Sequence, residues 1–548
     1  MSRDGTRDAP RALDILRAVA RHPRLRHLIE LAAARDGELA VRIAPCDPDR
    51  RQRAEPNIKA PTNRAGISPG TSRGARPGVP LRRSRHKKSH YSRSTFVECR
   101  SPSTAGPESW CEMQNLQAMA FAYFEHEWDS RTGLVRDKTA PNWPASIAAT
   151  GLALTCYPVA VERGFMSRAA AIERTLITLR FFWGSAQGTE PDATGYRGFY
   201  YHFLDMQSGR RAWRCELSTV DSAFLLAGML AVAAYFDGDS AEQREIRALA
   251  DALNRRADWQ WAQAADGTIG HGWHPETGFI PHRWQGYDEG LLLYVLALGS
   301  PTLGLGASAF AAWASSYEWK HYYDLDYLHS GPLFTHQLSH VWIDFRGIQD
   351  AFMRGKGIDY FENSRRATQI QQRYAIDNPL GYECYGADCW GITASDGPGP
   401  AERQIRGVMR RFYDYEGRGA PDGIDDGTLA PWAVIASLPF APEIVLPTIH
   451  HFTHALPRCH HERYGFKASF NQTWTELPAA DTPAGWHSPY CFGLNLGPIV
   501  LMIENHRSGM VWNLMRGCDW ITTGLRRAGF EGGWLRAEER PQPRDPGP

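Results

Sequence analysis

The feature that most restricts the fold is a run of eight apolar residues, 291–298 (LLLYVLAL), which follows the segment 284–290 (WQGYDEG). A helix that crosses a bilayer needs about 20 apolar residues, so this run is too short to span a membrane. It is also too continuous for a helix that has one face in water. We therefore expect a helix that is buried on all sides and carries Asp288 and Glu289 in its first turn.

Similar helical patterns recur along the chain and are separated by loops rich in Gly, Pro and aromatic residues. The expected helices are 114–128, 145–164, 167–184, 218–236, 241–261, 290–299, 307–321, 334–345, 358–376, 428–437, 441–455, 497–505 and 509–524. Sustained alternation of apolar and polar residues is rare, and short stretches such as 198–203 fit hairpins within loops. The pattern predicts an all-α fold whose helices form the two layers of an α/α toroid. An irregular helical solenoid is the alternative.

The N-terminal part of the chain differs in composition from the rest. Residues 1–100 contain 23 Lys and Arg against 10 Asp and Glu, whereas residues 101–548 contain 38 against 50. From residue 43 to about 108 the chain is rich in Arg, Pro, Gly and Ser, and such a composition cannot form a core. We predict a disordered basic extension over 1–108, one folded domain over 109–535 and a disordered tail over 536–548. The basic cluster 82–88 (RRSRHKK) would suit a nucleic acid or a membrane, but we favour an extension without function and expect neither partner.

Several classes of protein find no support in the sequence. No apolar run reaches about 18 residues, and the N-terminus lacks the apolar segment of a signal peptide, so no membrane helix is expected. The ten cysteines are scattered, and only Cys384 and Cys389 are close enough in sequence to suggest a bridge. The histidines form no H-E-x-x-H or similar ligand pattern, so neither a metal nor another cofactor is predicted.

Two carboxylates stand at the start of expected buried helices. Glu289 precedes the run 291–298, and Asp221 follows Ser218, which can cap the helix that begins there. Acidic residues at helix N-termini are often simple capping residues. If both face one cleft, they have the arrangement of an inverting glycosidase, whose carboxyl groups lie roughly 6.5–9.5 Å apart. Partial burial would raise the pKa of Glu289, as a general acid requires.

Further candidates lie in the loops. Glu216 and Asp396 are alternatives to Asp221 as the general base, although Asp396 precedes Gly-Pro and is also a natural turn residue. Asp344 beside Arg346 is either a substrate contact or a structural ion pair. The chain has 19 Trp, 21 Tyr and 23 Phe, and such rings stack on the C–H faces of pyranose sugars. The side chains expected to contact substrate are Trp284, Tyr287, Asp344, Arg346, Trp390 and Asp426.

Ten motifs, in order over about residues 113–531, resemble the glucoamylase-like domain family. They are 145–151 (ASIAATG), 203–206 (FLDM), 216–221 (ELSTVD), 286–289 (GYDE), 342–347 (WIDFRG), 360–368 (YFENSRRAT), 393–398 (TASDGP), 425–428 (DDGT), 439–443 (PFAPE) and 497–505 (GPIVLMIEN). This family includes the bacterial endo-β-1,2-glucanases of glycoside hydrolase family 144, and related domains occur in cyclic β-1,2-glucan synthases.

The resemblance implies an (α/α)6 barrel, inverting hydrolysis of β-1,2-glucan without a metal, and a periplasmic or secreted location. Glu289 matches the position of the family's general acid, and Asp221 is the first candidate for the base. Two features depart from the family. The basic extension stands where an export signal is expected, which would suit a cytoplasmic protein if this N-terminus is real. Leu496 stands before Gly497 where the family has a polar Gln.

The expected function is therefore hydrolysis of β-1,2-glucan by an inverting acid–base mechanism in a monomeric enzyme. One alternative is an exo-acting hydrolase that releases disaccharides from β-1,2-glucooligosaccharides. The other is a non-catalytic glycan-binding or assembly module on the same barrel, although the presence of all the candidate carboxylates weighs against it. A terpene-cyclase-like helical barrel is disfavoured, because no Asp-rich cyclase motif is evident.

Overall fold

The computed structural model describes residues 107–475 and 485–536. The predictions of disorder over 1–108 and 536–548 fall almost entirely outside these ranges. Within them the chain is mainly helical, and its strands are short and lie in hairpins and small sheets, as the sequence predicts. No described helix combines the length and the apolar character that a membrane span requires.

Five helices are buried on nearly every face. They are α4 (Ile147–Glu162), α6 (Thr219–Tyr235), α9 (Leu291–Gly299), α13 (Pro431–Ala436) and α15 (Gly493–Arg507). All nine residues of α9 and 15 of the 17 residues of α6 are buried, so these helices form an inner layer. The buried helix predicted over 291–298 is confirmed, but it begins at Leu291. Asp288 and Glu289 therefore lie in the turn before the helix.

A sixth inner segment consists of two 3₁₀ turns, η2 (Leu333–His336) and η3 (Leu338–Val341). The Ser339 hydroxyl accepts a hydrogen bond from Leu292 N at the start of α9 (3.1 Å), and Gln337 Nε2 donates to Ala433 O in α13 (2.6 Å). The continuous helix predicted over 334–345 is wrong, because these polar side chains bind the neighbouring inner helices and the segment forms two short turns.

The six inner segments form a closed ring. Helix α4 packs against both α6 and α15, α6 packs against α9, and α13 packs against α15. The hydrogen bonds of Ser339 and Gln337 close the remaining gap between α9 and α13. A ring in which each segment contacts the next excludes an open helical solenoid for the described residues.

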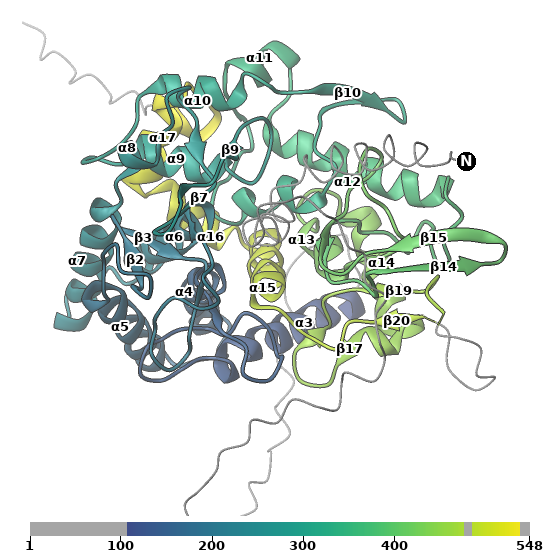
Figure 1. The fold of residues 1–548 in the computed structure, drawn as a ribbon, viewed down its shortest axis with the longest axis horizontal. Helices are drawn as coiled ribbons and strands as arrows, with labels where there is room; N and C mark the ends of the chain where they lie inside the picture. The colour runs from purple at the N-terminus through teal and green to yellow at the C-terminus, as the bar shows by residue number, and fades with distance from the viewer. Residues whose placement is uncertain (1–106, 476–484, 537–548) are drawn as a thin grey trace, which may run out of the picture. The chain divides into compact units, whose positions relative to one another are not determined.

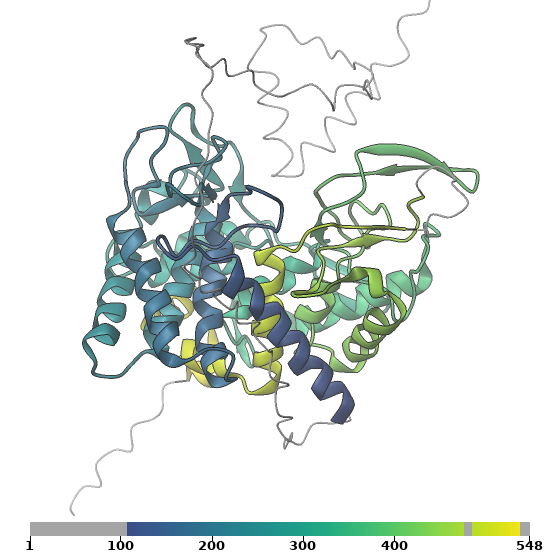
Figure 2. The ribbon, with the colours of Figure 1, turned by 90° about the horizontal axis from the view of Figure 1, so that it is seen from below.

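An outer helix covers each inner segment. The outer helices are α5 (Arg168–Gly184) on α4, α7 (Ala241–Arg256) on α6, α10 (Ala307–Ala314) on α9, α12 (Tyr360–Asp377) on η2, α14 (Pro442–Ala455) on α13 and α3 (Pro107–His126) on α15. Figure 1 shows α5 and α7 at the left edge of the view and α15 near its centre, and in Figure 2 the purple helix α3 crosses the front. Outer helices bury one face only, as α7 does with Ile246, Ala250 and Leu253. This alternation confirms the predicted two-layered α/α arrangement.

Glycines allow the inner helices α4 and α6 to touch. A Cβ atom at Gly228 would lie 2.1 Å from Gly151 O, and one at Gly151 would lie 2.4 Å from Phe224 O. Both obstacles are backbone atoms, which cannot rotate away. The two helices therefore approach each other more closely than any side chain at these positions would permit.

Small sheets join the loops at the N-terminal ends of the inner helices. The largest has the strand order β2 (Gly195–Tyr196), β3 (Phe199–Tyr201), β5 (Leu217–Ser218), β7 (Gly272–His274) and β8 (Gly278–Phe279), all antiparallel. Two pairs complete this end: β1 (Ala145–Ser146) with β4 (Phe203–Leu204), and β6 (Ile269–Gly270) with β9 (Arg283–Trp284). Strands β1 and β5 run directly into α4 and α6, so the sheets fix the positions of the first residues of these helices.

The remaining elements are short. They are α8 (Trp259–Ala262), α11 (Ala351–Lys356), α16 (Met510–Arg516), α17 (Asp519–Arg527), η4 (Pro457–Cys459), η5 (Gly533–Leu535), and the strand pairs β10 (Trp319–Tyr322) with β11 (Leu325–Leu328), β12 (Ile348–Gln349) with β21 (Glu531–Gly532), β13 (Ala394–Ser395) with β16 (Glu416–Gly417), β14 (Ala401–Ile405) with β15 (Val408–Phe412), β17 (His460–His461) with β18 (Gly465–Phe466), and β19 (Phe470–Asn471) with β20 (Trp486–His487). Asp258 caps α8 and splits the helix predicted over 241–261. Cys384 and Cys389 form a disulfide.

Candidate active site

Asp221 lies in the first turn of α6 and is buried. The Ser218 hydroxyl donates a hydrogen bond to Asp221 Oδ2 (2.5 Å) and accepts one from Asp221 N (3.2 Å), so the predicted capping residue also fixes the carboxylate. His202 joins Asp221 to the second predicted acid. Its Nε2 atom lies 3.7 Å from Asp221 Oδ2, and its Nδ1 atom lies 2.8 Å from Glu216 Oε1.

Glu289 is buried in the turn that precedes α9, next to α6 in the ring. A hydrogen bond from Trp284 Nε1 to Thr219 Oγ1 (2.9 Å) ties this turn to the start of α6. The Trp284 ring also stacks on His271, with the ring centres 3.8 Å apart. Glu289 and Asp221 therefore stand at the same end of two adjacent inner helices, as the sequence predicts.

The neighbouring acid, Asp288, has a structural role. Its Oδ1 atom accepts hydrogen bonds from Trp313 Nε1 and Gly290 N, both at 2.9 Å, and its Oδ2 atom accepts one from Gln285 N (3.1 Å). These three bonds close the turn that holds Glu289. Burial raises the pKa of Asp288 to about 7, although the hydrogen bond from Trp313 opposes the shift.

Asp396 follows β13 and is also buried. Its Oδ2 atom accepts a hydrogen bond from the Ser488 hydroxyl (3.1 Å), and its Oδ1 atom lies 4.0 Å from Lys138 Nζ. Burial raises the pKa of this carboxyl, and the charge of Lys138 opposes the shift. The Lys138 ammonium lies over the rings of Trp143 (4.2 Å), Phe492 (4.8 Å) and Tyr490 (5.0 Å).

Sequence reasoning missed Asp137, Lys138 and His202. Burial raises the pKa of Asp137 to about 6, while the charge of His202 opposes the shift and that of Asp396 adds to it. Asp137 thus lies within electrostatic reach of both acid-bearing segments. We call Asp137, Lys138, His202, Glu216, Asp221, Glu289 and Asp396 the acid–histidine cluster. The sequence signal for Asp137 and Lys138 was their place just before the apolar helix 145–164, as Glu216 and Glu289 precede theirs.

Aromatic rings border the acid–histidine cluster. Trp143 Nε1 donates a hydrogen bond to Asp137 Oδ2 (3.1 Å), and its ring meets that of Trp213 edge-on, with the centres 4.7 Å apart. Phe203 contacts Trp213 (5.3 Å) and stacks on His202 (3.9 Å). Trp213 is 57% exposed, and its φ of 54° places it in the left-handed region, which is rare for a bulky residue. Strained residues of this kind concentrate at functional sites.

The structure places five of the six predicted substrate contacts outside this cluster. Asp344 forms two hydrogen bonds with Arg346 (both 2.8 Å) and a further ion pair with Arg516 in α16, beyond the C-terminal end of α15. This is the structural ion pair that the sequence offered as an alternative. Asp426 binds Arg418 through two hydrogen bonds (2.7 and 2.8 Å), and both side chains are fully buried.

Trp284, in β9, is tied to the start of α6 through Thr219, whereas the other two aromatic candidates lie in the interior. Trp390 is fully buried and donates to Thr448 Oγ1 of α14 (2.8 Å), which leaves no room for a ligand. The Tyr287 ring packs among Tyr317, His336 and Tyr360 in the interior. Both side chains therefore belong to the core between the layers.

Two other observations bear on ligands. The ligand atoms of His202, Glu216 and Asp221 lie within 4.8 Å of one another, so they are close enough to hold a cation.

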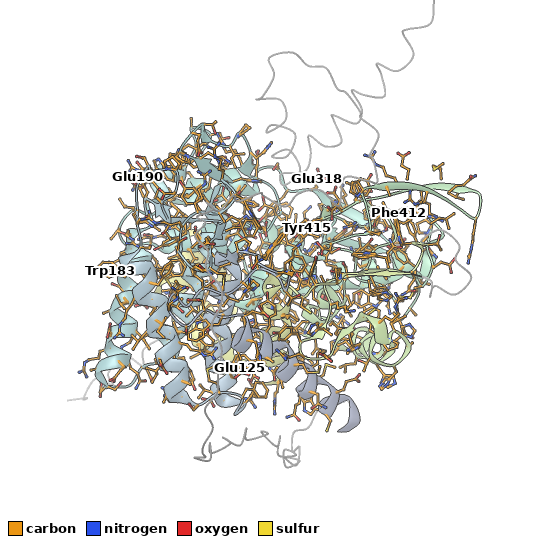
Figure 3. All side chains as sticks on the ribbon, turned by 60° about the horizontal axis from the view of Figure 1, so that its bottom comes forward. Glu125, Trp183, Glu190, Glu318, Phe412 and Tyr415 are labelled. Carbon is orange, nitrogen blue, oxygen red and sulfur yellow. A yellow bond between two sulfur atoms is a disulfide. The ribbon has the colours of Figure 1, made fainter. Side chains whose placement is uncertain are left out.

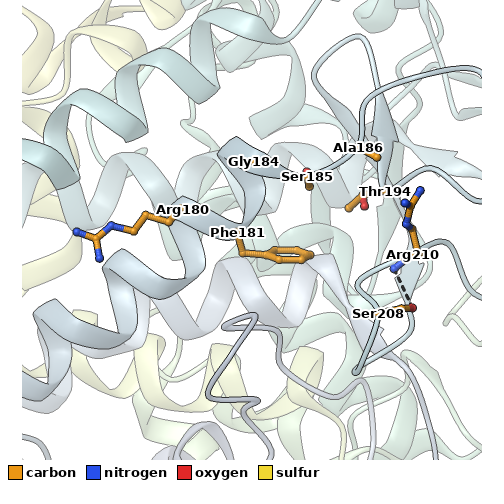
Figure 4. A pocket seen from close by; sticks show the side chains of 8 residues that line it. All are labelled: Arg180, Phe181, Gly184, Ser185, Ala186, Thr194, Ser208 and Arg210. Atoms are coloured by element: carbon orange, nitrogen blue, oxygen red, sulfur yellow. Dashed lines mark hydrogen bonds between the residues drawn. The ribbon is translucent and has the colours of Figure 1, made fainter.

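A pocket of about 480 Å³ lies away from the cluster, between the end of α5 and the loop after it, with Phe181 as one wall and Ser208 and Arg210 opposite (Figure 4). Arg180 points away from this pocket and binds Glu245 (2.7 Å).

Comparison with known proteins points to one family. Residues 281–519 match the family described as "Glycoamylase: Putative glucoamylase". An exo-β-1,2-glucooligosaccharide sophorohydrolase (non-reducing end) of Parabacteroides distasonis is 26% identical over 446 residues, which cover 75% of this chain and 57% of that protein. The chain thus spans little more than half the length of this curated relative.

Solved structures show the same fold. A putative glucoamylase of Bacteroides uniformis is 29% identical, with a TM-score of 0.68 over 79% of this chain and 100% of that one. The endo-β-1,2-glucanase of Chitinophaga pinensis, solved with sophorotriose and glucose, is 24% identical, with a TM-score of 0.66 over 78% of this chain and 99% of that one. These likenesses confirm the expected α/α barrel, and the family match over residues 281–519 agrees with the resemblance that the sequence motifs indicated.

Proposed function

We propose that this chain is a glycoside hydrolase that cleaves β-1,2-linked glucose chains with inversion at the anomeric carbon. The observation that carries the proposal is the pair of buried carboxyls, Asp221 and Glu289, at the N-terminal ends of the adjacent inner helices α6 and α9. Inverting hydrolysis needs an acid and a base on opposite sides of the scissile bond. The activities of the sophorohydrolase and the endo-β-1,2-glucanase support the linkage.

In the proposed reaction Glu289 donates its proton to the glycosidic oxygen as the bond from that oxygen to the anomeric carbon breaks. A water molecule attacks the anomeric carbon from the opposite face and gives its proton to the base. Glu289 is buried in the turn before α9, where it can deliver this proton as the general acid. The new hydroxyl at the anomeric carbon has the α configuration.

Asp221 is the best candidate for the base. Its Oδ2 atom is held by Ser218, but none of the described residues gives a hydrogen bond to its Oδ1 atom, although that atom is buried. That oxygen therefore keeps an acceptor position that no described residue fills, as the base of the proposed reaction requires. Glu216 is engaged by His202, and Asp396 is engaged by Ser488 on one oxygen. These two acids are better placed to position His202 and Lys138.

The decisive experiment replaces each acid by its amide. Glu289→Gln removes the proton that the leaving oxygen needs, so hydrolysis of β-1,2-glucan should fall by at least about 10²-fold with little change in stability. Asp221→Asn should also abolish most turnover but leave oligosaccharide binding measurable. Glu443→Gln is the control, because Glu443 forms an exposed ion pair with Arg365 on the outer layer. Proton NMR of the first product should show the α-anomer. Near-normal activity of folded Glu289→Gln would disprove the assignment.

One observation favours the exo-acting alternative: the Parabacteroides relative is an exo-acting sophorohydrolase. An exo enzyme would release a single disaccharide from the first minutes of the reaction, whereas an endo enzyme would give a ladder of products. The time course of products from a long linear β-1,2-glucan therefore separates the two. An absence of both products together with saturable binding would favour a non-catalytic module.

We also propose that the domain works in an oxidising compartment such as the periplasm. The Cys384–Cys389 disulfide supports this location, because disulfides persist in oxidising compartments and are rare in the cytosol. Fractionation of the native host, with detection of the protein by antibody, tests the proposal. Recovery in the cytosol with both thiols free would contradict it.

A further inference from the structure

A second groove, of about 880 Å³, lies between the outer helices α3 and α14. Leu116 and Met119 of α3 and Leu446 of α14 form its apolar wall, and no member of the acid–histidine cluster lines it. Its polar side chains include Glu112, His450 and His454. The groove therefore joins two elements that are more than 300 residues apart in the sequence.

The three polar side chains converge. His450 and His454 stand four residues apart on α14, so they share one face of the helix, and their ring centres are 4.3 Å apart. Glu112 reaches them from α3, with Oε2 3.6 Å from His450 Nδ1 and Oε1 3.9 Å from His454 Nε2. One ligand atom from each residue lies within 4.8 Å of the others.

These separations suit a transition-metal ion. Zinc binds imidazole nitrogen and carboxylate oxygen at about 2.0–2.2 Å, and in tetrahedral geometry this places neighbouring ligand atoms about 3.3–3.5 Å apart. The observed 3.6 and 3.9 Å exceed that range by a few tenths of an ångström. Rotation of the exposed histidine rings can close such a difference without movement of either helix.

The Glu112 carboxylate supports the same conclusion. Its Oε1 atom is buried, and no donor among the described residues makes a hydrogen bond to it. Both histidine contacts are too long for hydrogen bonds, so direct pairing leaves this oxygen unsatisfied, which costs free energy. A cation between the three side chains would satisfy it.

We propose that Glu112, His450 and His454 bind a divalent transition-metal ion of the zinc class and thereby link α3 to α14. The three protein ligands leave one position for water. The site stands apart from the proposed hydrolysis and takes no part in it. Its effect would be to stabilise the folded domain, because an ion that binds only the folded state shifts the unfolding equilibrium.

The test is a titration of the untagged full-length protein with zinc chloride by calorimetry. The titration uses the Cys111→Ser background, because the exposed Cys111 thiol lines the same groove and can bind zinc by itself. Glu112→Gln and His450→Ala should each bind one zinc ion fewer per chain than the parent, or bind it at least about 10-fold more weakly. The count matters, because His202, Glu216 and Asp221 offer a second possible site.

His321→Ala is the matched control. The His321 side chain is 63% exposed, close to the 68% and 62% of His450 and His454, and it also contacts one carboxylate, that of Asp326 (2.9 Å). The described structure places no third ligand beside this pair. The control should bind as much zinc as the parent.

Thermal unfolding supplies the second measurement. Saturating zinc should raise the Tm of the parent by about 2–4 °C more than it raises the Tm of Glu112→Gln or His450→Ala. Equal zinc stoichiometry and affinity in the parent and both variants would overturn the site. Loss of one zinc ion without any difference in Tm would retain the site and overturn its role in linking the two helices.

Discussion

The carboxylates of this domain differ in their partners more than in their sequence surroundings. Although burial works against it, the ion pair with Arg418 lowers the pKa of Asp426, and the hydrogen bonds of Arg346 do the same for Asp344. Such carboxylates are charged, have their hydrogen-bonding capacity filled by protein groups, and have a structural role. Asp221 instead keeps one buried oxygen that no described residue engages. This difference, and not the residue type, separates the proposed base from the structural acids.

Trp213 is expected to bind a sugar ring at the edge of the acid–histidine cluster. It is 57% exposed, and it is fixed by Trp143 and Phe203. Loss of a stacking surface that acts on substrate and transition state alike raises KM and leaves kcat nearly unchanged. Trp213→Ala should therefore raise KM for β-1,2-glucooligosaccharides about 10-fold, equivalent to about 1.4 kcal/mol.

Trp183→Ala is the control for Trp213. Trp183 is 50% exposed but lies in α5 of the outer layer, at the left edge of the view in Figure 3. Its replacement should leave both KM and kcat unchanged. Equal kinetics for the two variants would contradict the role of Trp213 while leaving the assignment of Glu289 intact.

Asp288 should make the stability of the domain depend on pH. Its pKa is raised from 3.8 to about 7 by burial, so the folded state binds a proton that the unfolded state releases. This contribution is fully present below about pH 4 and is lost as pH rises through 7. Relative to Asp288→Asn, the wild type should lose about 2–4 kcal/mol of unfolding free energy between pH 4 and pH 8. Urea unfolding of both proteins at several pH values measures it, and parallel curves would contradict the prediction.

At the scale of the elements, the contact between α4 and α6 leaves no space for an added side chain. Gly228→Ala would put a methyl group 2.1 Å from Gly151 O, so one helix must move, at a cost of about 1–3 kcal/mol. Gly355→Ala is the control, because Gly355 also lies within a helix, α11, but has no atom within 4 Å of an added Cβ. The control should be neutral or slightly stabilising. Denaturant midpoints of the two variants test the difference, and equal midpoints would show that the helices can separate at no cost.

Apolar content and periodicity predicted most of the helices, because inner helices are buried all round and outer helices bury one stripe. The segment 334–345 was the exception. Its turns depend on Gln337 and Ser339, whose partners lie in α13 and α9, about 100 and 47 residues away. No local pattern reveals such bonds. The break at Asp258, in contrast, is a capping residue that the sequence displays.

The candidate site could be predicted from the sequence where an acidic residue stands at the start of an expected helix. Asp221 lies in the first turn of α6, as expected, whereas Glu289 lies in the turn before α9 and not in its first turn. His202 was missed because its role depends on the pairing of β3 with β5, which brings it beside Glu216. Asp426 was predicted to contact substrate because its partner, Arg418, is visible only in three dimensions. For Asp344, the ion pair with Arg346 was an alternative that the sequence left open. The residue types can be read from the sequence. Whether an acidic residue has a structural or a functional role depends on its partners in the folded domain.

For the whole molecule, ring closure joins the two ends of the folded domain. Helix α3, the first described element, packs on α15, the last inner helix, and Gln117 Nε2 donates to Val500 O (3.0 Å) across 383 residues. Each inner segment is buried only when both of its neighbours are in place. The ring should therefore unfold in one step and not helix by helix. The chain boundary near residue 107 therefore matters for stability.

The last prediction concerns that boundary. Residues 107–536 should fold alone and unfold in a single calorimetric transition, with the same activity as the full chain. Removal of α3 as well, to leave 127–536, would expose α15 and lose the buried side chains of Met113, Leu116, Phe121 and Phe124, each of which contributes roughly 1.5–3 kcal/mol. The shorter fragment should therefore be insoluble or melt far lower. Two separate transitions for 107–536, or equal Tm values for the two fragments, would show that the domain does not depend on a closed ring.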